Sequence, residues 1–436
     1  MKIKIIIVAF FLGSVTALFG QPITRVDGTK IPEDSLTRHI EELRHAAKVS
    51  GLCIAVFNQN KIVYKKAFGL ANVPENVPLS TSMIFYGASF SKAVFAYTVM
   101  RLVDQKVIDL DKPLVAYLPK SLMDYPEAGP RGNYQDLKND ERYKKITARM
   151  CLDHTTGFPN WRFFEDDKKL RIKFDPGTHY SYSGEGLCLL QFIIEQKTGE
   201  DLETIARRNV FAPLGMADAS YVWQKSFDQH LVLGHDATGK TFDVHKRSKA
   251  NAAGSLCTSF DDYLKFYAAL INGKGLSTSS FNEMLKAQIR IHAKQQFGPQ
   301  ALENTTDNDN IQLSYGLGFG LFTTPFGPAF FKEGHDDGWQ HYSVCFRDKG
   351  VAIVMMSNSD NAESIFKPLL AYCIGDTYTP WYWENYIPIG DRKARPGFAY
   401  YCPPCNNACD TIAHEYSGLC PVCKMQLVER AINAKQ

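Results

Sequence analysis

Two Ser-x-x-Lys motifs are the first features of this 436-residue chain whose residue types and spacing could do chemistry. A serine hydroxyl is a poor nucleophile until a base removes its proton, and a desolvated lysine can act as that base. One motif runs from Ser89 to Lys92 and the other from Ser364 to Lys367. Because chance alone gives roughly one or two such motifs in a chain of this size, each must be judged by its surroundings.

Only the first motif opens a predicted buried helix. Residues 91–105 are apolar on more than one face, which is typical of a helix enclosed within a domain. Residues at i and i+3 share a helix face, so Lys92 would lie beside Ser89, and the positive end of the helix dipole would help to keep that lysine neutral. The second motif runs directly into Pro368. For the first motif alone, an N-cap serine with a solvated lysine remains the alternative.

Two later segments could complete a site around Ser89. A Pro-Gly turn at 176–177 leads through an aromatic stretch to a predicted helix, and Tyr182 on this loop could be a second proton carrier. Residues 332–339 lie on or just after a predicted strand, whose backbone N–H groups could stabilise an oxyanion. His335 would line the same groove. Taken alone, this tyrosine is more simply a packing residue and this histidine a turn residue.

In this order, the three segments resemble the β-lactamase-related serine hydrolases, most closely the class C and esterase branch. Residues 151–159 also resemble that family's Leu-x-x-His-Thr-Ser-Gly-x-Pro segment, and residues 109–114 its Leu-Asp-Asp-Pro-Leu stretch. The likeness covers about residues 35–375. It implies that Ser89 is the acylated nucleophile and that Lys92 and Tyr182 share the base and acid roles. It also implies an oxyanion hole made by the N–H groups of Ser89 and Gly338.

Two departures from the family pattern bear on the substrate. The family usually has Asn two residues after the catalytic Tyr, where this chain has Gly184. Its third motif, Lys/His-Thr/x-Gly, reads here as His335-Asp336-Asp337, so Asp337 replaces the expected glycine. The first departure removes an amide that could bind substrate, and the second adds carboxylates where a β-lactam carries its own carboxylate.

These departures favour a serine hydrolase that acts on a small-molecule or peptide ester or amide, as an esterase or a D-amino acid peptidase would, over an efficient β-lactamase. The catalysis needs no cofactor. Two other hypotheses stay open. One is a catalytically weak or inactive relative of penicillin-binding proteins that binds cell-wall fragments, and the other is metal capture through the cysteine-rich C-terminus. The sequence leaves the oligomeric state open.

The order of predicted elements indicates an α+β fold. A helix over 35–47 precedes a strand pair at 52–57 and 61–67, helices follow at 186–197, 201–209 and 260–271, and a run of strands ends with a helix within 362–374. This order predicts an antiparallel sheet flanked by helices, whose first and last strands meet, with an inserted helical subdomain. Residues 121–145 are charged and rich in turn residues, and they are predicted to be a surface insertion. The hydrolase domain would span residues 21–376.

A cysteine-rich unit at 399–430 would follow a connection at 377–398. Cys402, Cys405, Cys420 and Cys423 form two Cys-x-x-Cys pairs with the spacing of a zinc ribbon. The segment also resembles a small heavy-metal-binding ribbon. We expect structural zinc, with Cys409 or His414 as possible substitute ligands, and disulfides are the rival staple.

The remaining features concern location and partners. Lys2 and Lys4 precede an apolar stretch that is short for a spanning helix, so residues 1–20 are predicted to be a signal peptide of an exported, periplasmic or secreted protein. An uncleaved anchor is the alternative. No other run is apolar enough to span a membrane. The net charge of +3 gives no electrostatic case for binding nucleic acid.

Overall fold

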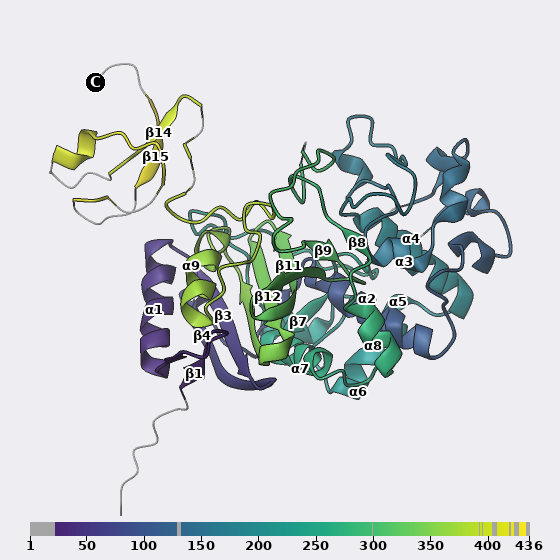
Figure 1. Ribbon diagram of the computed structural model, residues 1–436, viewed down its shortest axis with the longest axis horizontal. Helices are drawn as coiled ribbons and strands as arrows, with labels where there is room; N and C mark the ends of the chain where they lie inside the picture. The colour runs from purple at the N-terminus through teal and green to yellow at the C-terminus, as the bar shows by residue number, and fades with distance from the viewer. Residues whose placement is uncertain are drawn as a thin grey trace, which may run out of the picture.

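The computed structural model describes residues 22–128, 132–298, 300–391, 393–394, 396–402, 408–417, 420–422 and 427–432 (Figure 1). The predicted signal peptide at 1–20 lies outside these residues. Across the part of the chain that the structure describes, none of the helices combines the length and apolar character that a bilayer crossing requires.

A nine-stranded antiparallel sheet forms the centre of the fold, in the order β5-β4-β3-β13-β12-β11-β10-β9-β8. Strand β3 near the N-terminus pairs with β13, the last strand of the sheet along the chain. This confirms the α+β class and the predicted meeting of first and last strands. The bounds are β3 Gly51–Asn58, β4 Lys61–Asn72, β5 Val77–Pro78, β8 Ile289–Arg290, β9 Ser314–Tyr315, β10 Gly320–Thr324, β11 Gly327–Asp336, β12 Trp339–Phe346 and β13 Val351–Ser357.

Two terminal helices cover one face of the sheet. Helices α1 (Glu33–Ala46) and α9 (Glu363–Cys373) lie side by side there (Figure 1). Leu36 and Ile40 of α1 join Leu369 of α9 in one buried cluster, as the amphipathic spacing of α1 requires. Pro368 is accommodated inside α9. A short strand pair, β1 (Ile23–Thr24) with β2 (Lys30–Ile31), precedes α1.

The opposite face carries α2 and the helical subdomain. Nearly every residue of α2 (Phe90–Asp104) is buried, in agreement with its apolar sequence on more than one face. The strands β6 and β7 pair beside its N-terminus. The remaining bounds are α3 Ala148–Leu152, α4 Gly184–Thr198, α5 Leu202–Ala206, α6 Ala212–Leu214, α7 Phe260–Ile271, α8 Thr278–Met284, β6 Ile84–Tyr86 and β7 Cys257–Ser259, with a π-helical turn at Arg207–Phe211.

Two segments differ from their sequence-based interpretation. Within the expected surface insertion at 121–145, Leu122, Tyr134 and Tyr143 are buried among the apolar residues of the subdomain. Within the expected connection at 377–398, Trp381 and Trp383 are 2% exposed and belong to the core beneath α9. In both segments, aromatic side chains bury enough apolar surface to fix a chain that has little regular structure.

The cysteine-rich unit contains one strand pair. Strand β14 (Phe398–Tyr401) is antiparallel to β15 (Val428–Ala431), and a short 3-10 helix at Ala408–Thr411 lies between them in the chain.

Candidate active site

A sharp turn places Ser89 at the start of α2. After β6, Ala88 has a φ of 44°, a left-handed conformation that is costly for a residue with a Cβ. The turn is held by the Gly87 N–H, which donates to the Leu256 carbonyl at 2.7 Å, and by the Phe90 N–H, which donates to the Gly87 carbonyl at 2.9 Å. Strained backbone is typical of functional sites, and here it fixes the position of one hydroxyl.

Lys92 lies against this hydroxyl. Its Nζ donates to Ser89 Oγ at 2.8 Å and to the Ala253 carbonyl at 2.6 Å, and the residue is 3% exposed. Burial, reinforced by the nearby charge of Lys332, lowers the pKa of Lys92 to about 7. A substantial neutral fraction is therefore present near pH 7, which a base for Ser89 requires.

Tyr182 approaches the same pair from the loop before α4. Its ring centroid is 5.0 Å from Lys92 Nζ, and it stacks obliquely on His154 at 4.3 Å. Burial and the charge of Glu333 raise the pKa of the Tyr182 phenol well above its ordinary value, against a hydrogen bond with Ser89 that lowers it. Tyr182 is therefore a neutral phenol in contact with the serine.

Lys332 is a site residue that the sequence interpretation missed. Its Nζ donates to the Tyr182 hydroxyl at 3.1 Å and pairs with Glu333 Oε1 at 2.6 Å, in a fully buried position on β11. Burial lowers the pKa of Lys332, against the charge of Glu333. Residues 332–334 read Lys-Glu-Gly, which fits the lysine form of the family's third motif. This Lys-x-Gly spacing, which begins three residues before His335, is the sequence signal for Lys332.

His335 occupies a different environment from the one expected. Its Nδ1 lies 2.5 Å from Glu363 Oε1 at the start of α9, and about half of the side chain is exposed. Burial opposes protonation, but the hydrogen bond to Glu363 and its charge prevail and raise the pKa of His335 to about 9. The imidazole thus belongs to an ion pair with α9, which sets it apart from the side chains that contact Ser89.

The amide of Gly338 does not serve the expected role either. Its N–H donates to Asp360 Oδ1 at 2.6 Å, in the turn between β11 and β12. The expectation that this N–H helps to form an oxyanion hole therefore fails, because a carboxylate on the loop after β13 already occupies the donor.

The register of β11 points to another backbone donor. Asp336 and Trp339 flank a two-residue turn and face each other, so they form a hydrogen-bonded pair. In an antiparallel ladder such pairs recur at every second residue, and the N–H of His335 therefore points away from β12. Strand β10 pairs with β11 only as far as Phe331, which leaves this edge open. The edge lies beside Ser89, because a Cβ added at Gly334 would be 3.3 Å from the Gly87 carbonyl oxygen.

An aromatic ring explains why position 184 is a glycine. Gly184 is the first residue of α4, and its N–H donates to the backbone carbonyl and side-chain oxygen of Asn160, each at 3.1 Å. A Cβ at this position would lie 2.4 Å from the Trp161 ring, which is closer than real Cβ contacts come. That ring reaches Lys92, whose Nζ is 5.7 Å from its centroid. Trp161 therefore fills the space that a side chain at position 184 would need.

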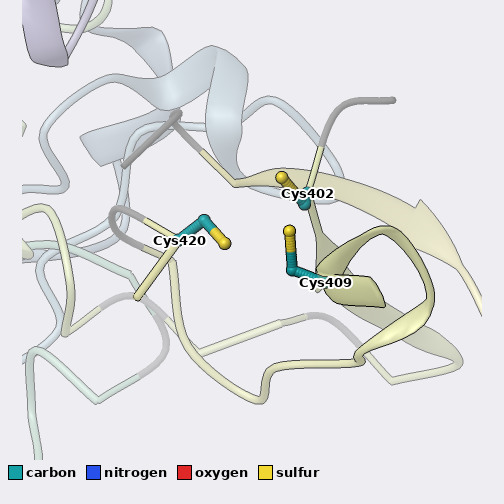
Figure 2. Close-up of side chains that lie close together, drawn as sticks. All are labelled: Cys402, Cys409 and Cys420. Carbon is teal, nitrogen blue, oxygen red and sulfur yellow. The ribbon is translucent and has the colours of Figure 1, made fainter. Parts of the chain in front are cut away.

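The cysteine-rich unit brings together two of the four expected ligands, Cys402 and Cys420, with the possible substitute Cys409. The buried Sγ atoms of Cys402, Cys409 and Cys420 lie within 4.8 Å of one another and point toward a common centre (Figure 2). Cys405 and Cys423, two of the four expected ligands, lie outside the described residues. Three thiolates around one point are a set of soft ligands that suits zinc.

Comparison with known proteins places the large domain. The Beta-lactamase family matches residues 36–371. Esterase EstB of Burkholderia gladioli is 28% identical over 321 residues, which cover 65% of this chain and 77% of the esterase. A D-aminopeptidase of Gluconobacter oxydans (strain 621H) is 26% identical over 347 residues, which cover 76% of this chain and 60% of that enzyme. A penicillin-binding protein of Bacillus subtilis (strain 168) is 23% identical over 325 residues, which cover 69% of this chain. The match spans 66% of the Bacillus protein, so the chain covers less than two thirds of it and of the D-aminopeptidase.

Solved structures give the same fold at low sequence identity. The octameric penicillin-binding protein homologue from Pyrococcus abyssi has a TM-score of 0.61 at 20% identity, over 80% of this chain and 78% of its own. EstCE1, a hydrolase with promiscuous acyltransferase activity, has a TM-score of 0.62 at 16% identity, over 79% of this chain and 99% of its own. With a family match over most of its length, this chain belongs to the Beta-lactamase family.

Proposed function

We propose that this protein is a serine hydrolase that cleaves a small ester or amide through an acyl-enzyme on Ser89. The observation that carries the proposal is the 2.8 Å contact between Ser89 Oγ and a buried Lys92 whose pKa is near 7. A nucleophile in contact with a base of matched pKa is the arrangement that acyl transfer needs. The relatives named esterase and D-aminopeptidase support the same reaction class.

The proposed first step uses Lys92 as the base. Neutral Lys92 takes the hydroxyl proton as Ser89 Oγ attacks the substrate carbonyl, and the N–H groups of Ser89 and His335 stabilise the oxyanion that forms. Tyr182 then passes a proton to the leaving group, with the Lys332 ammonium supporting any negative charge on the phenol oxygen. The leaving alcohol or amine departs and the acyl group stays on Ser89.

The second step reverses these roles. A water molecule attacks the acyl carbonyl and gives a proton to the Tyr182 phenolate. Protonated Lys92 returns its proton to Ser89 Oγ as the bond between the acyl carbon and Ser89 Oγ breaks. Each group therefore returns to its starting protonation state. All the groups in this scheme belong to the chain itself, and the scheme uses no cofactor.

The side chains near the β11–β12 turn argue against efficient β-lactam hydrolysis. Asp336 accepts a hydrogen bond from the Tyr86 hydroxyl at 3.1 Å, and Asp337 is exposed beside it. A β-lactam carboxylate placed near them would meet like charge, which costs free energy of binding.

A substrate panel tests the proposed function. We expect wild-type protein to hydrolyse p-nitrophenyl acetate or a D-amino acid p-nitroanilide, to hydrolyse a chromogenic cephalosporin far more slowly, and to lose turnover when Ser89→Ala is introduced. The variant Ser364→Ala, in the second Ser-x-x-Lys motif, is the matched control and should keep full activity. A protein that turns over no ester or amide but binds peptidoglycan fragments equally well as Ser89→Ala would contradict a hydrolase and support the fragment-binding alternative.

The cysteine-rich unit is proposed to hold one structural zinc ion through Cys402, Cys409 and Cys420, with a fourth ligand from the cysteines outside the described residues. A unit of this size has too small a core to fold without a staple. Metal analysis should find about one zinc per chain, and Cys409→Ser should lower the zinc content without changing ester turnover. Zinc-free protein with disulfides seen by non-reducing mass spectrometry would refute the metal.

Export to the periplasm or the medium is also proposed, on the basis of the N-terminal sequence at residues 1–20. The size of a fusion expressed in a bacterial host, compared between whole cells and the periplasmic fraction, would show whether the segment is removed.

A further inference from the structure

A cavity of about 230 Å³ is lined by residues that lie next to the candidate active site along the chain. Its walls come from β6, from the loop at 223–245 and from the turn between β11 and β12. Two wall residues are close in sequence to the site. Tyr86 is three residues before Ser89, and Asp336 directly follows His335. A group attached to a substrate held at Ser89 can therefore reach it, because three residues span at most about 11 Å.

Five aromatic side chains line the cavity, together with aliphatic and acidic residues. Trp339 stands edge-to-face to Phe85 and to Tyr86, each with a centroid distance of 6.1 Å. Trp223 and Phe242 complete the wall. Aromatic faces carry partial negative charge and attract a cation within about 6 Å, and several rings around one space are typical of sites for substituted ammonium groups.

The charged groups in the lining are almost all negative. Asp243, Asp336 and Asp337 line the cavity, and the described lining contains no lysine or arginine. Two cations lie just outside. Arg247 lies over the Tyr86 ring at 5.5 Å. Lys246 lies over the Trp223 ring at 5.3 Å, and Asp228 at 2.7 Å balances its charge.

The balance therefore favours a cation inside. With Arg247 counted as a full charge, the three carboxylates still leave an excess of two negative charges at neutral pH. A substrate carboxylate would be repelled there, whereas an ammonium group would meet carboxylates at the mouth and aromatic rings in the wall.

We infer that this cavity binds a cationic, ammonium-bearing group of the substrate, and thereby selects cationic esters or amides over neutral and anionic ones. The inference rests on the proposed function, since it names the substrate class of the Ser89 site. Asp243, Asp337 and the aromatic wall are specificity-determining residues that contact the charged group and take no part in the bond that breaks.

Matched substrates test the inference. The p-nitrophenyl ester of 4-(trimethylammonio)butyrate is compared with that of 5,5-dimethylhexanoate, which has the same shape and no charge. Acetylcholine is compared with 3,3-dimethylbutyl acetate to place the cation on the leaving group. We expect kcat/KM to favour the cationic member by about tenfold in at least one pair. A ratio near one, or below one, in both pairs would overturn the inference.

Variants then locate the effect. The double variant Asp243→Asn with Asp337→Asn should reduce the cationic preference severalfold, measured as the ratio of kcat/KM within each matched pair. Asp348→Asn is the matched control, since Asp348 is an exposed aspartate in the turn at the other end of β12. A preference that survives the double variant unchanged would place the selection elsewhere and refute the assignment to this cavity.

A binding measurement separates failure of the inference from failure of the proposed function. Choline and its neutral isostere 3,3-dimethylbutan-1-ol are titrated against Ser89→Ala, with tryptophan fluorescence reporting on Trp223 and Trp339. Tighter, saturable binding of choline supports the inference even if the wild type proves inactive toward esters. Serine-dependent acetate hydrolysis without any preference for choline would overturn the inference alone.

Discussion

Two buried lysines set the electrostatics of the Ser89 site at the scale of single residues. Lys332 Nζ donates to the Tyr182 hydroxyl, and Lys92 Nζ lies 5.0 Å from the centroid of the same ring. Of the two lysines, Lys332 has a carboxylate partner, Glu333, at 2.6 Å. The unpaired position of Lys92 leaves burial and the charge of Lys332 to lower its pKa to about 7. The two lysines therefore differ in their surroundings: burial lowers the pKa of both, but the charge of Glu333 opposes that shift at Lys332, whereas Lys332 adds to it at Lys92.

The pH dependence of turnover should report this difference. Because Lys92 must be neutral to accept the proton, kcat/KM for p-nitrophenyl acetate should fall as the pH drops below about 7. Lys332→Met removes a charge that lowers the pKa of Lys92, so the acidic limb should move to higher pH by about one unit. Lys332→Arg keeps the charge and should leave the limb near 7. A limb that does not move in Lys332→Met would contradict the coupling.

The sequence allowed some of these residues to be predicted and hid others. Ser89, Lys92 and Tyr182 could be predicted, because a helix start and a loop before a helix have recognisable sequence signals. The structure brings the three side chains together. Lys332 has a local signal in its Lys-x-Gly spacing, but its contact with Tyr182, 150 residues away, leaves no pattern in the sequence. Gly338 was assigned from a motif, whereas the destination of its N–H depends on Asp360 in a distant loop.

At the scale of elements, the start of α4 is built around Trp161. The ring lies over Gly184, and the next residue in each segment forms an ion pair, since Arg162 Nη2 is 2.8 Å from the fully buried Glu185 carboxylate. Removing one partner of such a pair leaves a buried charge, so the pair fixes the 161–164 turn on α4. Gly184 and Trp161 are thus sterically linked, because a side chain at position 184 would need the space that the ring fills.

The prediction for this element uses the smallest possible side chain. Gly184→Ala places a Cβ 2.4 Å from the Trp161 ring and should lower the free energy of unfolding by about 1–3 kcal/mol. Chemical denaturation measures the change. In a Trp161→Ala background, Gly184→Ala should lower the free energy of unfolding far less than it does in the wild type, because the clash is absent there. Equal effects of Gly184→Ala in both backgrounds would refute the clash.

At the scale of the whole molecule, the large domain extends past the residues 36–371 that match the Beta-lactamase family. Trp381, Trp383 and Tyr386 pack beneath α9, and the Tyr342 hydroxyl of β12 donates to Glu384 at 2.9 Å. The segment after α9 is therefore part of the core that supports β11 and β12, which carry Lys332 and the turn beside Ser89.

Truncation should reveal this dependence. A chain that ends after residue 376 loses the buried tryptophans and should unfold at a temperature lower by several degrees or more than a chain that ends after residue 397, because each buried tryptophan contributes about 3–5 kcal/mol. The longer truncation lacks only the cysteine-rich unit and serves as the control. Equal melting temperatures for the two chains would show that the segment is only a connection.

The sequence predicts the central sheet better than it predicts where the large domain ends. The paired apolar runs near 52–67 and 341–356 have strand periodicity, and their meeting in β3 and β13 follows from the order of elements. Segments at 121–145 and 377–398 have turn-forming residues and little periodicity, so their buried aromatic residues gave no sign of the surface against which they pack.

The most direct test of the account is to identify the residue that is acylated. Wild-type protein treated with a fluorophosphonate should gain one adduct, and mass spectrometry of its peptides should place that adduct on Ser89. Labelling should slow below about pH 7 as Lys92 becomes protonated, and it should disappear in Ser89→Ala. An adduct on any other residue, or full ester turnover by folded Ser89→Ala protein, would contradict the assignment of Ser89 as the nucleophile.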